Sequence, residues 1–216
     1  MKILYDDKYL AVVEKDVGSS SETDGSGNDV ITLASDKLGC GLYPVHRLDK
    51  TTGGAIILAK DADTAAKLSE AVASREIVKE YLAVVCGSPA EESGIYEDLL
   101  FRDVRKNKTY VVDRKRRGVK EASLEYRVIG TAQDERLGTL SLVRIKLHTG
   151  RTHQIRVQFS SRKTPLAGDG KYGRGDNRCA PALWSTRICF VHPVSGENIE
   201  CESMPSGGFP WDLFNM

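Results

Sequence analysis

Two segments of the chain concentrate charged and polar groups that are costly to bury, and both lie between apolar stretches. The first segment, PVHRLDKTTGG at residues 44–54, places four such groups within five residues: His46, Arg47, Asp49 and Lys50. A carboxylate in this setting can act as a nucleophile or as an acid–base group. The alternative interpretation is a surface turn with an ion pair between Asp49 and Arg47.

The second segment, LHTGRTHQIRVQF at residues 147–159, places basic and amide side chains at the expected start of a helix. We expect Thr152 to cap this helix. The backbone N–H groups and the dipole of a helix N-terminus attract anions, so the segment predicts phosphate binding. The polar groups are Arg151, His153, Gln154 and Arg156. A glycine-rich loop at residues 164–178 follows and lets the backbone approach a ligand closely.

The charge of the chain is unevenly distributed, although its formal net value is only +1. Residues 102–120 contain nine basic groups and two acidic ones, and residues 151–178 contain seven and two. Residues 1–29 are acidic, with seven acidic groups and three basic ones. Two basic segments on one face would form a phosphate-binding surface that the total conceals. A solvated loop is the alternative for the 102–120 run.

Length and composition favour a globular protein. The chain has 216 residues, of which 40% are hydrophobic and 28% charged, and no apolar run approaches the roughly 20 residues of a membrane-spanning helix. The N-terminus lacks a secretory pattern, and the five cysteines are scattered without a C-x-x-C pair. We therefore expect a soluble, cytoplasmic protein with reduced thiols and no membrane partner.

Strands outnumber helices in the expected element order. Residues 18–28, rich in Gly and Ser, are expected to form a mobile loop that ends at Asn28 or Asp29, either of which can cap a helix over residues 30–38. Asp61 is expected to cap a second helix. Strands are expected at residues 2–7, 9–15, 54–60, 78–86, 120–130, 137–148, 186–193 and 198–204. This order favours an α+β fold, a single mixed domain with a large, mainly antiparallel central sheet flanked by helices and loops.

Taken in order, the chemistry-bearing segments resemble the RluA-type pseudouridine synthase family. HRLDKTTGGAIILAK is similar to the family's HRLDxxTSG segment and the apolar strand after it, and VKEYLAVVCG to its K-x-Y-x-A strand. TGRTHQIRVQF and TPLAGDGKYG are similar to its TGRTHQIRVH and PI-x-GD-x-x-YG block. FVHPVSGENIECESMP is similar to its closing hairpin. The resemblance extends from about Ile3 to Pro205.

The resemblance implies an enzyme that isomerises uridine to pseudouridine in structured rRNA or tRNA without a metal or another cofactor. It implies one catalytic domain over residues 1–216 without a separate S4-like RNA-binding module, and we expect a monomer. Asp49 then corresponds to the catalytic carboxylate, Arg156 to its paired cation and Tyr81 to the active-site aromatic residue. The alternatives are a structural turn aspartate, a phosphate contact and a core aromatic, respectively.

A uridine in folded RNA must leave its stack to react, and Arg47 resembles the residue that fills the space it vacates. The other expected RNA contacts are His46, Thr52, Arg151, His153, Gln154 and Lys171. A metal site at His46 and His153 would need a third ligand, and no suitable spacing supplies one.

The sequence departs from the family pattern at Asp16, Gly53 and Trp184, where the family usually has Pro, Ser and His. These changes affect the expected shape of the cleft rim and leave the RNA target open. One alternative function is an RNA-binding or RNA-folding protein of the same fold with little catalysis. Another is a hydrolase or phosphotransferase that uses the glycine-rich loop, although this loop lacks the G-x-x-x-x-G-K-[ST] order.

Overall fold

The computed structural model describes residues 1–23, 25 and 27–215. Asp24 and Ser26 belong to the predicted mobile loop and lie outside the described residues. The chain forms two compact units. The first unit comprises Met1–Glu80 and Trp184–Pro205, and the second comprises Tyr81–Leu183 and Ser206–Met216.

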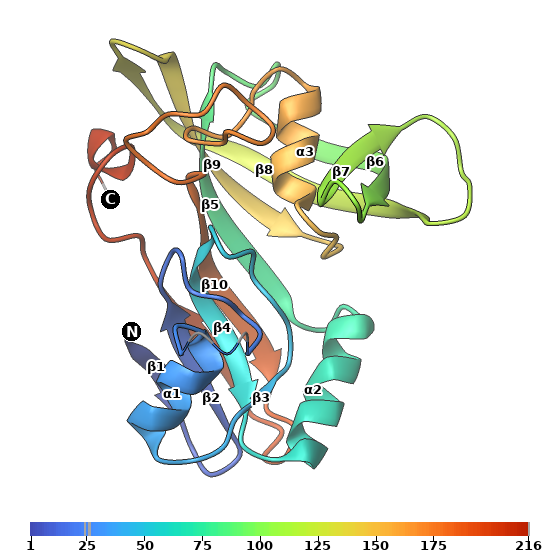
Figure 1. Cartoon of the computed structure of the whole chain (residues 1–216), viewed down its shortest axis with the longest axis vertical. Coiled ribbons are helices and arrows are strands. Elements are labelled where there is room, and N and C mark those ends of the chain that lie inside the picture. Colours follow the sequence, from blue (N-terminus) through green and yellow to red (C-terminus); the bar gives the residue numbers. More distant parts are fainter. Residues whose placement is uncertain (24, 26, 216) are drawn as a thin grey trace. The chain divides into compact units, whose positions relative to one another are not determined.

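Strands of the first unit follow the order β1-β2-β4-β10, with β11 paired to β10 and β3 paired to β4 (Figure 1). Their pairings are antiparallel except for β4 with β10, which are parallel. The strands are β1 (Ile3–Asp6), β2 (Leu10–Lys15), β3 (Tyr43–Pro44), β4 (Gly53–Ala59), β10 (Leu183–Val191) and β11 (Asn198–Glu202). Every residue of β4 is buried, so this strand forms the centre of the unit and positions the polar loop before it.

Two helices complete the first unit, α1 (Val30–Leu38) and α2 (Ala62–Ala73). Of the two candidate caps of α1, Asp29 is the one used, and its side chain accepts the N–H of Thr32. The predicted cap Asp61 of α2 is confirmed. Leu68 of α2 joins a core cluster with Leu10, Ile57 and Ile188 from three of the strands.

Strands of the second unit follow the order β5-β9-β8-β6-β7 (Figure 1). They are β5 (Val78–Cys86), whose first three residues belong to the first unit, β6 (Ser93–Asp103), β7 (Lys108–Val112), β8 (Val119–Asp134) and β9 (Gly138–Leu147). The helix α3 (Gln154–Ser161) packs against β6 and β7, and a short 3₁₀ helix, Trp211–Leu213, lies near the C-terminus. Phe159 of α3 is fully buried and packs edge-on against Tyr96 and Tyr126.

The predicted α+β class with mainly antiparallel strands is confirmed, and the prediction of one domain over residues 1–216 stays a prediction. Two features differ from expectation. The strands β6 and β7 occupy a region for which no strand was expected. The expected cap Thr152 is wrong, because α3 is preceded by His153 in the left-handed conformation at φ 55°. In the part of the chain that the structure describes, every helix is too short or too polar to cross a bilayer.

Candidate active-site residues

The loop that carries Asp49 connects β3 to β4 in the first unit, and its backbone is fixed on both sides of this residue. The Ser21 hydroxyl accepts the N–H of Leu48 at 3.1 Å and donates to the carbonyl of the same residue at 2.8 Å. The N–H of Gly18 donates to the carbonyl of Lys50 at 2.8 Å. Two neighbours of Asp49 are therefore bonded to one segment, residues 18–21, which limits the movement of the carboxylate between them.

Lys15 is a fully buried cation beneath this loop, at the end of β2. Its Nζ donates to the carbonyls of Ser19 at 2.8 Å and Asp16 at 3.0 Å. Burial lowers the pKa of Lys15 to about 8, while the charges of Asp16 and Asp49 act in the opposite direction. Lys15 was not predicted to be a site residue. Its only signal was a lysine that closes an otherwise apolar strand.

Two departures from the family pattern are a matched pair in the structure. A Cβ added at Gly53 would lie 2.2 Å from Cζ3 of Trp184, so the indole ring occupies the space that a serine would need. The ring is buried, and its Nε1–H donates to the Ser203 hydroxyl at 3.0 Å. Because β4 and β10 pair at these two residues, a tryptophan at position 184 requires a glycine at position 53.

The first unit holds three predicted RNA contacts. Arg47 is exposed and forms an ion pair with Glu22. Thr52 is buried, and its N–H donates to the carbonyl of Asp49 at 2.9 Å. His46 is partly buried, and its Nε2 accepts the N–H of Ile57 in β4 at 3.1 Å. That nitrogen of His46 is therefore committed to the fold, and the RNA contacts of all three residues stay predictions.

His46 makes the stability of the protein depend on pH. Burial, assisted by the charge of Lys79, lowers the pKa of His46 to about 3 from its ordinary 6.5. Below about pH 6.5, His46 of the unfolded chain binds a proton, whereas His46 of the folded chain stays neutral until the pH approaches 3. The free energy of unfolding should thus fall as pH drops toward 3, by up to about 1.4 kcal/mol per pH unit from this group. Urea unfolding of wild type and His46→Gln between pH 4 and 7 should show a shallower dependence in the variant, and equal slopes would contradict this.

In the second unit, Tyr81 is buried on β5 and Arg156 is buried on α3. The Nε and Nη2 of Arg156 donate to the two carboxylate oxygens of Asp169 at 2.7 and 2.8 Å. Burial acts to raise the pKa of Asp169, but the bonds and charge of Arg156 and two backbone N–H groups lower it below its ordinary value. Asp169 was not predicted to be the partner of Arg156. The predicted pairing of Arg156 with Asp49 joins residues of different units and stays a prediction.

The other predicted RNA contacts of the second unit have partners within it. Gln154 is buried, and its Oε1 accepts from the Thr149 hydroxyl and the Arg151 N–H at 2.8 and 3.0 Å. The Nε of Arg151 donates to the carbonyl of Glu121 at 3.0 Å. Nδ1 of His153 lies 2.9 Å from the Tyr172 hydroxyl, and Nζ of Lys171 donates to the carbonyl of Asn107 at 2.9 Å.

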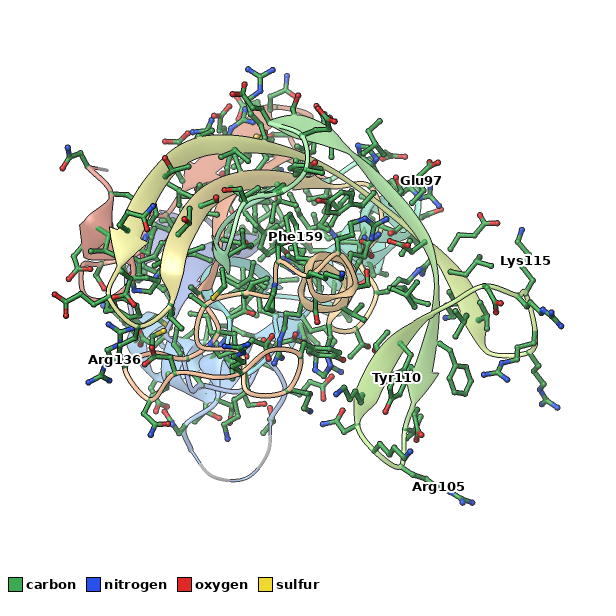
Figure 2. The ribbon with its side chains drawn as sticks, turned by 90° about the horizontal axis from the view of Figure 1, so that it is seen from above. Glu97, Arg105, Tyr110, Lys115, Arg136 and Phe159 are labelled. Carbon is green, nitrogen blue, oxygen red and sulfur yellow. The ribbon has the colours of Figure 1, made fainter. Side chains whose placement is uncertain are left out.

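The basic run at residues 102–120, here called the basic hairpin, comprises the end of β6, strand β7 and the start of β8. Figure 2 shows Arg105, Tyr110 and Lys115 along this hairpin, away from the buried Phe159. The exposed cations of its two turns are Arg105, Lys106, Arg114, Lys115, Arg116 and Arg117. Their density forms a strongly positive surface, which suits a polyanion.

Comparison with known proteins defines the class to which this fold and these residues belong. A family model described as RNA pseudouridylate synthase matches residues 8–161. The chain therefore belongs to the RNA pseudouridylate synthase family. It is an RNA pseudouridine synthase, an isomerase, and the predicted RluA-type membership is confirmed.

Individual relatives agree with this assignment, and a solved structure shares the fold. The chain is 32% identical to the RNA pseudouridine synthase YhcT of Bacillus subtilis, over all of this chain and 71% of that protein. It is 31% identical to ribosomal large subunit pseudouridine synthase D of Zymomonas mobilis, over 94% of this chain and 68% of the relative. The solved structure of human RNA pseudouridylate synthase domain containing 1 matches with a TM-score of 0.80 and 23% identity. The match covers 94% of this chain and 83% of the human chain. That structure shows the shared fold.

Proposed function

We propose that this isomerase converts specific uridines of a structured RNA to pseudouridine with Asp49 as the reactive carboxylate. In this reaction the bond between N1 of uracil and C1′ breaks, C5 bonds to C1′, C5 loses a proton and N1 gains one. The carboxylate acts beside C1′, either as the nucleophile or by forming and quenching an unsaturated sugar. The observation that carries the proposal is the fixed backbone on both sides of Asp49, because a reacting group must be held in place.

Tyr81 and Arg156 complete the proposed set. The ring of Tyr81 would stack on uracil, and its hydroxyl can take part in proton transfer. Arg156 would supply positive charge that keeps a carboxylate ionised and oriented. The competing function, an RNA-folding protein with little catalysis, requires none of these groups for its activity.

We propose ribosomal RNA as the first substrate to test, because relatives from Zymomonas mobilis and Xanthomonas campestris are named ribosomal large subunit synthases. Pseudouridine should be mapped in total RNA from cells that contain the protein, lack it, or contain Asp49→Asn. One or a few sites in ribosomal RNA should disappear in both deficient strains. Loss of sites only in transfer RNA would reject the ribosomal target. Sites that disappear without the protein but persist with Asp49→Asn would reject the role of Asp49.

The basic hairpin should bind RNA phosphates, so affinity should fall steeply with added salt. Reversing Arg114 and Arg117 to Glu should weaken binding. It should also make the negative slope of log affinity against log salt shallower by roughly 1.5 to 2. Reversing the exposed Lys8 and Lys67 of the first unit is the matched control and should change the slope little. Fluorescence anisotropy from 50 to 300 mM salt measures both. Equal changes in the two variants would favour the alternative interpretation, in which the hairpin is solvated and does not contact RNA.

Arg47 should matter for extruding the uridine rather than for bond chemistry. Unstacking costs a few kcal/mol in a structured RNA and least in an open strand, and about 1.4 kcal/mol is tenfold in rate. Arg47→Ala should therefore be roughly 100-fold slow on a stem-loop and nearly wild type on an RNA whose target uridine is unstacked. Single-turnover rates on both RNAs test this expectation. Equal slowing on the two would remove the extrusion role.

A further inference from the structure

Tyr172, in the glycine-rich loop of the second unit, joins the basic hairpin to the start of α3. Its hydroxyl accepts the backbone N–H of Thr109 at 2.7 Å, and Thr109 lies in β7 at the centre of the hairpin. The same hydroxyl lies 2.9 Å from Nδ1 of His153, the residue that precedes α3. The Thr109 hydroxyl reinforces the connection by donating to the carbonyl of Thr152 at 2.9 Å.

The Tyr172 hydroxyl can supply the hydrogen of its bond to His153. A phenol has one hydrogen, and a backbone N–H can only donate. Because the Tyr172 oxygen accepts from Thr109, its own hydrogen is available for Nδ1 of His153. When the hydroxyl donates this hydrogen, Nδ1 accepts it, and a neutral imidazole then carries its own hydrogen on Nε2.

The rest of Tyr172 contacts the pair of Arg156 and Asp169. The guanidinium carbon of Arg156 lies 5.2 Å from the centre of the tyrosine ring, within the range of a cation–π contact. The backbone N–H of Tyr172 donates to Oδ1 of Asp169 at 3.1 Å. Its carbonyl accepts from the hydroxyl of Ser160 in α3 at 2.5 Å. One residue therefore contacts the hairpin, the helix, the cation and the carboxylate of that cation.

We propose that Tyr172 is a positioning residue of the isomerase, one that couples the basic hairpin to His153 and to the helix that carries Arg156. The coupling sets the ring of His153 in its Nε2–H form and fixes the helix start relative to the strand that contacts RNA. The proposal rests on the proposed function, which gives the hairpin its RNA and Arg156 its role. If the hydroxyl were lost, Nδ1 of His153 and the N–H of Thr109 would lose their partner, whereas the ring and backbone contacts of Tyr172 with Arg156, Asp169 and Ser160 would remain.

The first experiment needs no RNA. ¹⁵N NMR of the imidazole rings, recorded at a pH where they are neutral, distinguishes a ring nitrogen that carries hydrogen from one that accepts. In the wild type, Nδ1 of His153 should accept and Nε2 should carry the hydrogen, whereas Tyr172→Phe should show a mixture of both forms. The matched control is Tyr126→Phe, which removes the hydroxyl of a buried tyrosine that donates to the carbonyl of Glu91 in the same unit and is hydrogen-bonded to Tyr96. It should leave the His153 spectrum unchanged.

The second experiment measures turnover. Tyr172→Phe should lower the single-turnover rate about 3- to 10-fold, the effect of losing one hydrogen bond that holds reacting groups. Tyr126→Phe should stay within about twofold of wild type. In a His153→Ala background the Tyr172 hydroxyl no longer has the imidazole as a partner. Adding Tyr172→Phe to this background should therefore slow the reaction by less than about twofold.

A folded Tyr172→Phe with the wild-type His153 spectrum would overturn the proposal. Rate losses that simply multiply in the double variant would also overturn it, because independent effects show no coupling. Failure of the proposed function is recognised separately. In that case Asp49→Asn would keep its turnover, while the imidazole spectrum, which involves no substrate, would still report on Tyr172.

Discussion

Replacing Asp49 with Asn should lower pseudouridine formation by at least about 10³-fold while the protein remains folded. The amide has nearly the shape of the carboxylate but carries no negative charge, so it can neither attack C1′ nor stabilise positive charge there. The loop should survive because its backbone is held through Leu48 and Lys50, and these bonds are unaffected by the substitution. Product analysis by mass spectrometry under single-turnover conditions measures the rate, and urea unfolding should change by less than about 1 kcal/mol.

Asp16→Asn is the matched control for this variant. Asp16 and Asp49 both act to raise the pKa of the buried Lys15, so either change removes a negative charge from the same cation. The side chain of Asp16 is 58% exposed and stands where the family usually has proline. Asp16→Asn should therefore keep nearly the wild-type rate. If the two variants were equally slow, the charge on Lys15 would explain the loss and Asp49 would have no chemical role.

Local sequence signals predicted much of this fold. Both helices of the first unit begin at a capping aspartate, because a cap depends on a side chain and a backbone N–H three residues later. The apolar strand β4 was visible as a continuous hydrophobic run before α2. These features require only short-range interactions, which the sequence displays directly.

The basic hairpin was missed as secondary structure because its sequence is dominated by charged residues. β7 pairs with β6 from Leu99 opposite Val112 to Asp103 opposite Lys108, and this strand pairing outweighs the local composition. The start of α3 differed for a similar reason. His153 adopts a left-handed conformation at φ 55°, and its ring is held by Tyr172, nineteen residues later in the sequence.

Buried charges were the least predictable part of the candidate site. Lys15 and Asp169 are both fully buried, although such residues usually lie at the surface. Their burial is possible only because carbonyls of residues 16 and 19 accept from the lysine and a guanidinium pairs with the aspartate. These partners are distant or conformation-dependent, so a sequence shows the charged residue but not the environment that accepts it.

Arg156→Ala should be almost as inactive as Asp49→Asn, with a rate at least about 100-fold below wild type, and it should also be unstable. The substitution leaves the carboxylate of Asp169 buried without its cation, which typically costs about 3–5 kcal/mol of unfolding free energy. Lost activity could then reflect lost structure. Urea unfolding together with single-turnover rates of this variant alone cannot distinguish a reacting group from a structural one.

The double variant Arg156→Met/Asp169→Asn separates the two roles. It removes both charges, and the asparagine oxygen can still accept the backbone N–H groups of Lys171 and Tyr172. Replacing a buried ion pair with neutral groups is often nearly neutral for stability, so unfolding should return to within about 1–2 kcal/mol of wild type. If Arg156 acts in the reaction, the rate should stay at least about 100-fold low despite restored stability, because no guanidinium is left to hold an ionised carboxylate. A double variant with wild-type stability and a wild-type rate would show that Arg156 serves only to neutralise Asp169.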